Sequence, residues 1–599
     1  MALRDELTAA GARTGEPLAL VLVPDRGLGL AWRGADGVRR RHVATADPVA
    51  VVAELEARGP RWVWWTARDT AADLVAGGVR PRACWDVGAV ARLLHGLSRD
   101  DAGAAWAAAH GLAAPPTTEG ELTLLDLAGE HADADPVRAD GHLSREWLRG
   151  SWADDPRDAA TWAGLLLETQ GLQEAGVRAL PDRRALPDRR ALGDPAPAPD
   201  RRATGSASPL PYLTALSESM AALLGVELEH DGLPIDRTVL ESLLTSTVGQ
   251  RPNSEAEEAV ARRTRDSLVW KEFPGEPVDL RNPASVRDLL ARVGIDVPDT
   301  RSWRLEPYAA TSPAVAALLA WRKAERIATT YGWPWLDRDI GADDRLRGVW
   351  GASEGAGRMT ASAGLHNLPT ELRTAVRPSP GRVLVRADLG QIEPRVLAAV
   401  SGDSALARAA REDDMYAPVA KALGSDRPTA KVAVLAAMYG QTSGPAGAAL
   451  KDMDRTYPTA MAFLRAAEES GRRGLDIRTY GGRLLRLSSL REALEDAGQD
   501  STMAHSYGRF ARNAVVQGAA AELFKAWAGT VRAGLVGLDA RIVLCLHDEL
   551  LVETDGAEAS RVVEVVEAAL RSTGSWWCAG SGVRLVSDTS VVASWADAK

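Results

Sequence analysis

Two stretches far apart in the sequence each place a carboxylate beside a short apolar run. Residues 383–385 (VLV) have the pattern of a buried strand, and Asp388 follows them. Pro394 fits only the first turn of a helix, so a helix is expected next. Residues 541–554 (RIVLCLHDELLVET) predict a β-hairpin with Asp548 at its polar tip. Carboxylates in such corners can hold a metal ion, although a lone Asp after a strand is more often a turn or capping residue.

A third stretch, SDRPTAKVAVLAAMYG at residues 425–440, predicts a helix between the two acidic corners. Ser425 or Asp426 can cap this helix, and Pro428 suits its first turn. Four of its residues recur at every fourth position and share one broad face: Arg427, Lys431, Leu435 and Tyr439. Two cations and the helix dipole favour phosphates at one end, and an aromatic ring about 18 Å away suits a base. This stripe therefore fits a nucleoside triphosphate laid along the helix.

In this order and spacing, the three stretches resemble motifs of family A DNA polymerases, the bacterial DNA polymerase I family. DLGQIEPR resembles the first catalytic motif, RPTAKVAVLAAMYG the nucleotide-binding helix, and HDE the third motif. Similar segments flank them: AGRMTAS and LHNLP come before, and YGGRLLRL, RNAVVQGAAAELFK and a terminal Trp595 come after. The resemblance covers residues 213–599.

The resemblance implies a template-dependent DNA polymerase that adds deoxynucleotides to a primer 3′-OH. Two Mg²⁺ ions held by hard oxygen ligands would serve this reaction. The implied metal ligands are Asp388, the Leu389 carbonyl, Asp548 and Glu549. The implied catalytic residues are Asp388, Asp548 and Lys431. The expected partners are primer-template DNA and deoxynucleoside triphosphates.

Further residues are assigned by the same resemblance. The implied nucleotide-binding residues are Gln391, Glu393, Arg427, Lys431, Leu435 and Tyr439, with Glu393 as a gate against a ribose 2′-OH. The implied DNA-binding residues are Arg358, Asn367, Arg395, Arg509, Asn513, Gln517 and His547. The chain also departs from the family pattern: Leu435 stands where the family has Phe or Tyr, Tyr416 where it has His, and Leu389 where it has an aromatic residue. These departures bear on nucleotide affinity and selectivity.

Residues 1–176 predict an α/β domain, with strands at 18–23 and 62–65 and helices at 71–75 and 87–94. By position this domain resembles the family's 3′→5′ proofreading exonuclease, which has an RNase H-like fold. That chemistry usually begins with an Asp-x-Glu pair on the first strand, but this chain has Asp25 alone there. Asp69 and Asp86 are interpreted as solvated surface groups. We therefore expect an inactive exonuclease-like domain.

The rest of the chain completes the expected architecture. Residues 177–210 contain a tandem RALPDR repeat and a Pro- and Ala-rich tail, which predict a flexible linker. Residues 211–599 are expected to form a mixed α+β polymerase domain with right-hand architecture. Its thumb would span about 213–331, and its palm and fingers about 332–599.

The composition bears on how the protein can bind DNA and in which compartment it works. The formal net charge is −10, so any DNA-binding surface must come from local clusters of Lys and Arg. The 3 cysteines have no metal-ligand spacing and fit a reducing cytosol. No apolar run is long enough to span a membrane. We expect a monomer in the bacterial cytoplasm, associated with the nucleoid.

Two other functions remain open on the sequence. The altered Leu435 and Tyr416 are compatible with a DNA-binding protein on a polymerase scaffold, with weak or no synthesis. A 3′→5′ exonuclease is the third possibility, against which the missing Asp-x-Glu pair argues.

Overall fold

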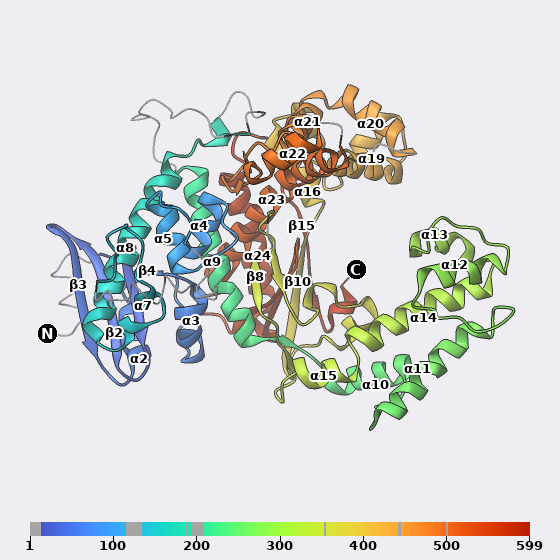
Figure 1. Cartoon of the computed structure of the whole chain (residues 1–599), viewed down its shortest axis with the longest axis horizontal. Helices are drawn as coiled ribbons and strands as arrows, with labels where there is room; N and C mark the ends of the chain where they lie inside the picture. The colour runs from blue at the N-terminus through green and yellow to red at the C-terminus, as the bar shows by residue number, and fades with distance from the viewer. Residues whose placement is uncertain are drawn as a thin grey trace. The chain divides into compact units, whose positions relative to one another are not determined.

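The structure is a computed structural model of the whole chain (Figure 1). It describes residues 13–115, 135–185, 190, 192–193, 208–352, 355–440, 445–498 and 501–598. These residues fall into two compact units. Unit 1 takes in Met1–His230, Trp350–Thr360 and Val385–Ser590, and unit 2 takes in Asp231–Val349, Ala361–Leu384 and Val591–Lys599. In the described ranges, no helix combines the length and the apolar character that crossing a membrane requires.

The N-terminal part of unit 1 is built on a five-stranded sheet with the order β3-β2-β1-β4-β5. β1 pairs antiparallel with β2, and β2 with β3, whereas β1–β4 and β4–β5 are parallel. The strands are β1 (Pro17–Val23), β2 (Gly27–Gly34), β3 (Gly37–Ala44), β4 (Arg61–Trp64) and β5 (Cys84–Asp86). The helices of this part are α2 (Pro48–Glu56), α3 (Ala67–Ala76), α4 (Val87–His95), α5 (Ala102–Ala109), α7 (Arg145–Leu148) and α8 (Pro156–Ala179). The expected α/β alternation is confirmed.

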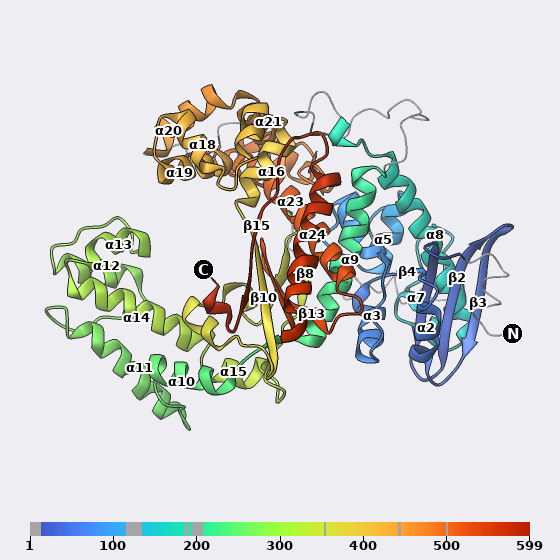
Figure 2. The same ribbon diagram turned by 180° about the vertical axis from the view of Figure 1, so that it is seen from behind.

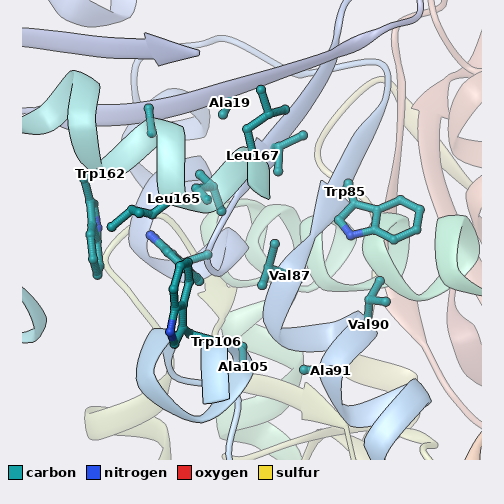
Figure 3. Close-up of a cluster of buried hydrophobic side chains, with 14 of the residues drawn as sticks. Ala19, Trp85, Val87, Val90, Ala91, Ala105, Trp106, Trp162, Leu165 and Leu167 are labelled. Carbon is teal, nitrogen blue, oxygen red and sulfur yellow. The ribbon is translucent and has the colours of Figure 1, made fainter. Parts of the chain in front are cut away.

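β1 is covered on both faces of this sheet, and its successive residues point to opposite sides. Ala19, Val21 and Val23 join a cluster with residues of α4, α5 and α8, to which Trp106 and Trp162 belong. Figure 3 shows these two indoles on the same side of the sheet as Ala19. Leucines of β1 face the other side and pack with α2, α3 and α9 (Leu210–Asp231). All seven residues of β1 are buried, so the strand offers apolar side chains on both faces.

A second sheet, most of whose residues belong to unit 1, carries both acidic corners. Its strands are β10 (Arg382–Leu389), β13 (Ala540–Cys545), β14 (Glu549–Asp555) and β15 (Ser587–Val592), in the order β13-β14-β10-β15. β13 and β14 form the predicted antiparallel hairpin. α23 (Thr502–Gly534) and α24 (Ala559–Trp577) lie beside this sheet, against β13 and β14 respectively (Figure 2). Two short pairs complete unit 1: β11 (Ile477–Arg478) with β12 (Leu484–Leu485), and β8 (Trp350–Ala352) with β9 (Met359–Ala361).

A group of helices lies at one end of this sheet in unit 1. They are α16 (Ile392–Ser401), α17 (Ser404–Ala409), α18 (Tyr416–Leu423), α19 (Arg427–Tyr439), α20 (Pro445–Thr456), α21 (Pro458–Arg472) and α22 (Arg491–Ala497). α21 packs along α23, and α19 packs against α18, α20 and α23. α19 begins after Asp426, whose side chain accepts a hydrogen bond from the Thr429 N–H, and it ends at Gly440 in the left-handed conformation. Capping by Asp426 is thus confirmed.

Unit 2 is mainly helical. Its helices are α10 (Arg237–Val248), α11 (Glu255–Trp270), α12 (Pro283–Ala291), α13 (Ser302–Ala309), α14 (Pro313–Thr330) and α15 (Trp333–Asp339), with the short strand pair β6 (Leu233–Pro234) and β7 (Arg345–Leu346). α11 to α14 enclose a core to which Leu289, Leu318 and Trp321 belong. The compact units therefore do not divide at the predicted boundary near residue 331, since residues 361–384 and the last residues also belong to unit 2.

The predicted flexible linker is wrong for its described part. Arg183 is buried and donates a hydrogen bond to the Leu192 carbonyl at 3.0 Å, and the Arg478 N–H donates to the same oxygen at 2.7 Å. Leu192 is itself buried. Arg183 and Leu192 are therefore docked against the fold, and residues 186–189, 191 and 194–207 lie outside the described ranges.

Candidate active site

The two acidic corners meet because β10 and β14 are neighbours. Asp388 is the second-last residue of β10, and Asp548 directly precedes β14. The Leu389 N–H donates a hydrogen bond to the Asp548 carbonyl at 2.7 Å. The sequence predicted a pair drawn from two distant stretches, and the fold brings this pair together. We call Asp388, Asp548 and Glu549 the acidic corner.

The acidic corner holds more negative charge than its surroundings neutralise. Burial, followed by repulsion from Asp388, Glu549 and Glu393, raises the pKa of Asp548 to about 6. Burial also raises the pKa of Asp388, although Arg386 opposes this shift. A divalent cation would relieve this repulsion, and carboxylate and carbonyl oxygens are the ligands that Mg²⁺ prefers. The carboxylate oxygens of Asp388 and Asp548 and the carbonyl oxygen of Leu389 are therefore the kind of ligand that such an ion prefers.

One cation already lies against the acidic corner. The Arg386 guanidinium contacts Glu549 at 2.7 Å, Asp388 at 2.8 Å and Asp588 of β15 at 3.4 Å. Among the described residues, no three His, Cys, Asp or Glu side chains converge on one metal-sized space. The Arg386 guanidinium is bound to two of the predicted ligands, Asp388 and Glu549. Arg386 was not predicted as a site residue from the sequence, although alternation along a strand puts residues 386 and 388 on one face.

Glu393 connects the acidic corner with α19. It lies in the first turn of α16, after Gln391 in the left-handed conformation with φ of 56°. The Tyr439 hydroxyl at the end of α19 donates to Glu393 Oε2 at 3.0 Å, and Arg358 forms an ion pair with Glu393 Oε1. Burial and then the Glu393 charge raise the pKa of Tyr439. The aromatic end of the stripe thus faces the helix that follows Asp388.

The other stripe residues lie on the accessible side of α19. Arg427 and Lys431 are exposed, and Leu435 is half-buried. The Arg427 guanidinium contacts Asp414 Oδ2 at 2.6 Å. Gln391 Nε2 donates to Asp414 Oδ1 at 2.9 Å. Asp414 was not singled out from the sequence, and it links two of the predicted nucleotide-binding side chains.

Three predicted DNA-binding residues follow each other on α23 at intervals of four: Arg509, Asn513 and Gln517. Arg509 is exposed, and the other two are half-buried. His547, beside Asp548, is exposed, and burial of part of its ring together with the Arg358 charge lowers its pKa. Asn367 belongs to unit 2, where its carbonyl accepts a hydrogen bond from the Tyr331 hydroxyl at 2.7 Å.

Arg395 is not a DNA-binding residue. Its side chain is 0% exposed, and its guanidinium donates to five backbone carbonyls at 2.7 to 3.0 Å. The acceptors are the carbonyls of Gly390, Ala410, Glu412, Asp413 and Arg584. All five guanidinium hydrogens can be satisfied in this way, so nothing remains for a phosphate. Arg395 instead ties the loop after β10 to two distant loops.

The interpretation of Asp86 as a solvated group is also wrong. Asp86 is 2% exposed and caps α4 by accepting from the Ala89 N–H at 2.7 Å. It also accepts from the Ala67 N–H at 2.6 Å and from Trp64 Nε1 at 3.2 Å. Burial raises the pKa of this carboxyl to about 7 in spite of these donors. Asp69 is exposed as predicted and accepts from the Thr66 hydroxyl at 2.7 Å.

Comparisons with known proteins agree with these motifs. The model of "DNA polymerase family A" matches residues 296–597. The thermostable DNA polymerase I of Thermus thermophilus is 30% identical over 308 residues, which are 45% of this chain and 35% of that protein. DNA polymerase I of Deinococcus radiodurans is 22% identical over 489 residues, 75% of this chain and 45% of that protein. The chain therefore spans less than half the length of these relatives.

A solved structure extends the comparison to the fold. The polymerase domain of Pol1 from M. smegmatis, in complex with DNA primer-template and dNTP, aligns with a TM-score of 0.63 and 20% sequence identity. The alignment covers 100% of this chain and 98% of that one. Because the family model spans about half of the chain and includes Asp388, Asp548 and α19, this protein belongs to DNA polymerase family A.

Proposed function

We propose that this chain is a template-dependent DNA polymerase that transfers deoxynucleotides to a primer 3′-OH. The observation that carries the proposal is the hydrogen bond between Leu389 and Asp548, because it joins two carboxylate corners that lie far apart in the sequence. Two Mg²⁺ ions bound there would supply activation of the primer oxygen and neutralisation of the leaving pyrophosphate. Asp388, Asp548 and the Leu389 carbonyl would hold them, and Glu549 would assist. Family membership and the fold shared with a polymerase domain support this assignment.

The helix stripe would bind the incoming nucleotide. Arg427 and Lys431 present exposed cations near the N-terminus of α19, where the helix dipole also favours phosphate. Arg427 would exchange Asp414 for the triphosphate. At the other end, Tyr439 and Glu393 are linked by a hydrogen bond beside Asp388, which supports the role of Glu393 as a steric gate at the sugar. Arg509, Asn513 and Gln517 would contact primer or template along α23.

The strand order and the helix groups also support an architecture. We assign the sheet β13-β14-β10-β15 to the palm, α16 to α22 to the fingers, and α10 to α14 to the thumb. The N-terminal sheet, with antiparallel β1 to β3 and parallel β4 and β5, supports an RNase H-like, exonuclease-like domain. We propose that the protein acts as a monomer.

Extension of a labelled primer tests the proposed function. The purified chain should add one nucleotide when the complementary dNTP and Mg²⁺ are both present, and none in EDTA. Incorporation should follow the template base when that base is changed. Addition that ignores the template, or no addition with any divalent ion while duplex DNA is bound, would contradict the proposal.

A DNA-binding protein with weak synthesis is the second candidate. The specific observation in its favour is the Arg386 guanidinium, which is bound to Asp388 and Glu549. The extension assay separates the two functions, because this candidate would shift a duplex in a gel and leave the primer unextended.

We expect that the wild-type chain does not remove a mismatched 3′ nucleotide. β1 carries only buried, apolar residues, and the Asp86 carboxylate already accepts three hydrogen bonds within the fold. No acidic pair is therefore available on the first strand for two-metal hydrolysis. Incubation of a mismatched, 5′-labelled primer with Mg²⁺ or Mn²⁺ checks this. Metal-dependent shortening that disappears in Asp69→Ala would show that the domain has kept a nuclease site.

Leu435→Phe should lower the apparent KM for nucleotide by about two- to tenfold. Leu435 lies half-buried between Lys431 and Tyr439 on the stripe, and an added ring contact is worth about 0.5–1.5 kcal/mol, or up to about tenfold. Steady-state incorporation of each dNTP measures the effect, with thermal melting as a check for overpacking against Met438. Lys431→Ala provides the contrast, since the loss of a phosphate contact should weaken the binding of all four nucleotides alike. Unchanged kinetics in a normally folded Leu435→Phe would remove Leu435 from the nucleotide site.

A further inference from the structure

Arg386 is unusually placed for an arginine in a sheet. It lies in the middle of β10, two residues before Asp388, so both side chains emerge on the same face of the strand. Its side chain is only 12% exposed. All three guanidinium nitrogens are directed to carboxylates: Nε to Glu549, Nη2 to Asp388 and Nη1 to Asp588. Arg386 is therefore a half-buried cation held by acids from three neighbouring strands.

Two of these three acids belong to the acidic corner. The oxygens that contact Arg386 are Asp388 Oδ2 at 2.8 Å and Glu549 Oε1 at 2.7 Å. An oxygen that accepts a hydrogen bond from a guanidinium offers less charge to a metal ion. A divalent ion close by would also be repelled by the positive charge, and this repulsion is strong in a partly buried site. Arg386 and a metal ion thus compete for the same carboxylates.

The third acid differs from the other two. Asp588 lies on β15, at the edge of the sheet, and its side chain is 64% exposed. Its Oδ2 is 3.4 Å from Nη1 of Arg386, so the guanidinium has a partner outside the acidic corner. A rotation of the arginine side chain toward Asp588 would free the other two oxygens while the positive charge keeps a counter-ion.

We propose that Arg386 is a resident counter-cation of the acidic corner, which occupies Asp388 and Glu549 until a divalent metal ion displaces it toward Asp588. The inference rests on the proposed function, since it concerns the metal site of the polymerase. It has a direct consequence for the reaction. The chain binds divalent metal weakly on its own, and the negative charge of an incoming triphosphate helps to offset Arg386. Metal loading is therefore coupled to nucleotide binding.

Direct metal binding tests the proposal without DNA or nucleotide. Mn²⁺ is titrated into the full chain, and free Mn²⁺ is followed by electron paramagnetic resonance. Arg386→Ala should bind Mn²⁺ about tenfold more tightly than wild type, or better, because a unit charge next to the ion has been removed. Arg571→Ala, which removes an exposed arginine paired with Glu567 on α24, is the matched control and should match wild type. Equal or weaker Mn²⁺ binding by Arg386→Ala would overturn the proposal.

Thermal melting provides a second readout, which is informative even if Arg386→Ala is unstable without metal. Without Arg386 the acids repel each other, so Arg386→Ala should melt below wild type in EDTA, and Mg²⁺ should raise its Tm more than that of wild type. If the variant is unfolded in EDTA, recovery of its fold with Mg²⁺ supports the proposal, and failure of any divalent ion to recover it contradicts the proposal. The neutral polar substitution Arg386→Gln should behave as Arg386→Ala does.

The two proposals fail in different ways. Tighter Mn²⁺ binding by Arg386→Ala in a chain that extends no primer would contradict the polymerase and leave the role of Arg386 standing. Template-dependent extension by wild type, with identical Mn²⁺ affinities in wild type and Arg386→Ala, would support the polymerase and contradict the proposed role of Arg386.

Discussion

Replacing either Asp388 or Asp548 by asparagine is expected to reduce primer extension by about a thousandfold or more. Each substitution keeps the shape of the side chain and removes the charge on which metal binding depends. Duplex binding should remain, because the phosphate backbone is bound by Lys and Arg and not by these acids. Single-turnover incorporation measures the loss, and a gel shift measures the binding. Substantial extension by either variant would refute the assignment of the acidic corner.

Stability provides the control for this prediction. Burial and like charges raise the pKa of Asp548 to about 6, so loss of its charge relieves repulsion in the folded state. The Tm of Asp548→Asn in EDTA should therefore equal or exceed that of wild type. Asp69→Asn, which changes an exposed carboxylate of the N-terminal sheet region, should leave extension unchanged.

Arg395→Met is expected to destabilise unit 1 by about 3–5 kcal/mol. The arginine is fully buried, and the substitution removes its hydrogen bonds to five backbone carbonyls, of which the Ala410 carbonyl keeps one from the Arg584 N–H at 3.2 Å. A buried acceptor that loses its partner costs about 1–3 kcal/mol, and these losses are partly offset by relaxation. Urea unfolding followed by tryptophan fluorescence measures the change.

Arg411→Met is the matched control for Arg395→Met. Arg411 is exposed, and its side chain donates one hydrogen bond within the described residues, to the Gly582 carbonyl at 3.3 Å, so its loss should cost less than about 0.5 kcal/mol. Equal stabilities of the Arg395 and Arg411 variants would mean that Arg395 is not the structural tie described above, and a DNA-binding role would be open again.

Local pattern predicted the elements that position the site. The apolar run before Asp388, the proline in the first turn of α16 and the two runs around Asp548 each depend on neighbours in the sequence, and each element formed as expected. The same holds for α19, since Asp426 and Gly440 mark its ends. These signals act within one or two turns, so a single sequence is enough to reveal them.

Long-range partners explain what local pattern did not predict. Arg395 ends the DLGQIEPR motif, where a cation is easily taken for a phosphate ligand, but four of its five acceptors are the distant carbonyls of residues 410, 412, 413 and 584. Asp86 was taken for a surface group because the donors Trp64 and Ala67 come from another strand and its following helix. Arg386 differs from Arg395 and Asp86, because its position two residues before Asp388 already indicates that the two side chains share one face of the strand. Its pairing with Glu549 still required the strand order of the sheet.

Fe²⁺-directed cleavage tests most directly whether the two corners form one metal site. Fe²⁺ replaces Mg²⁺, and ascorbate with peroxide then generates radicals that cut the backbone close to the bound ion. With primer-template and dNTP present, wild type should be cut near residue 388 and near residue 548 in the same reaction. Both cuts should disappear in Asp388→Asn and in excess Mg²⁺. Cleavage at only one of these places, or two cuts that persist in Asp388→Asn, would contradict a shared site at the junction of β10 and β14.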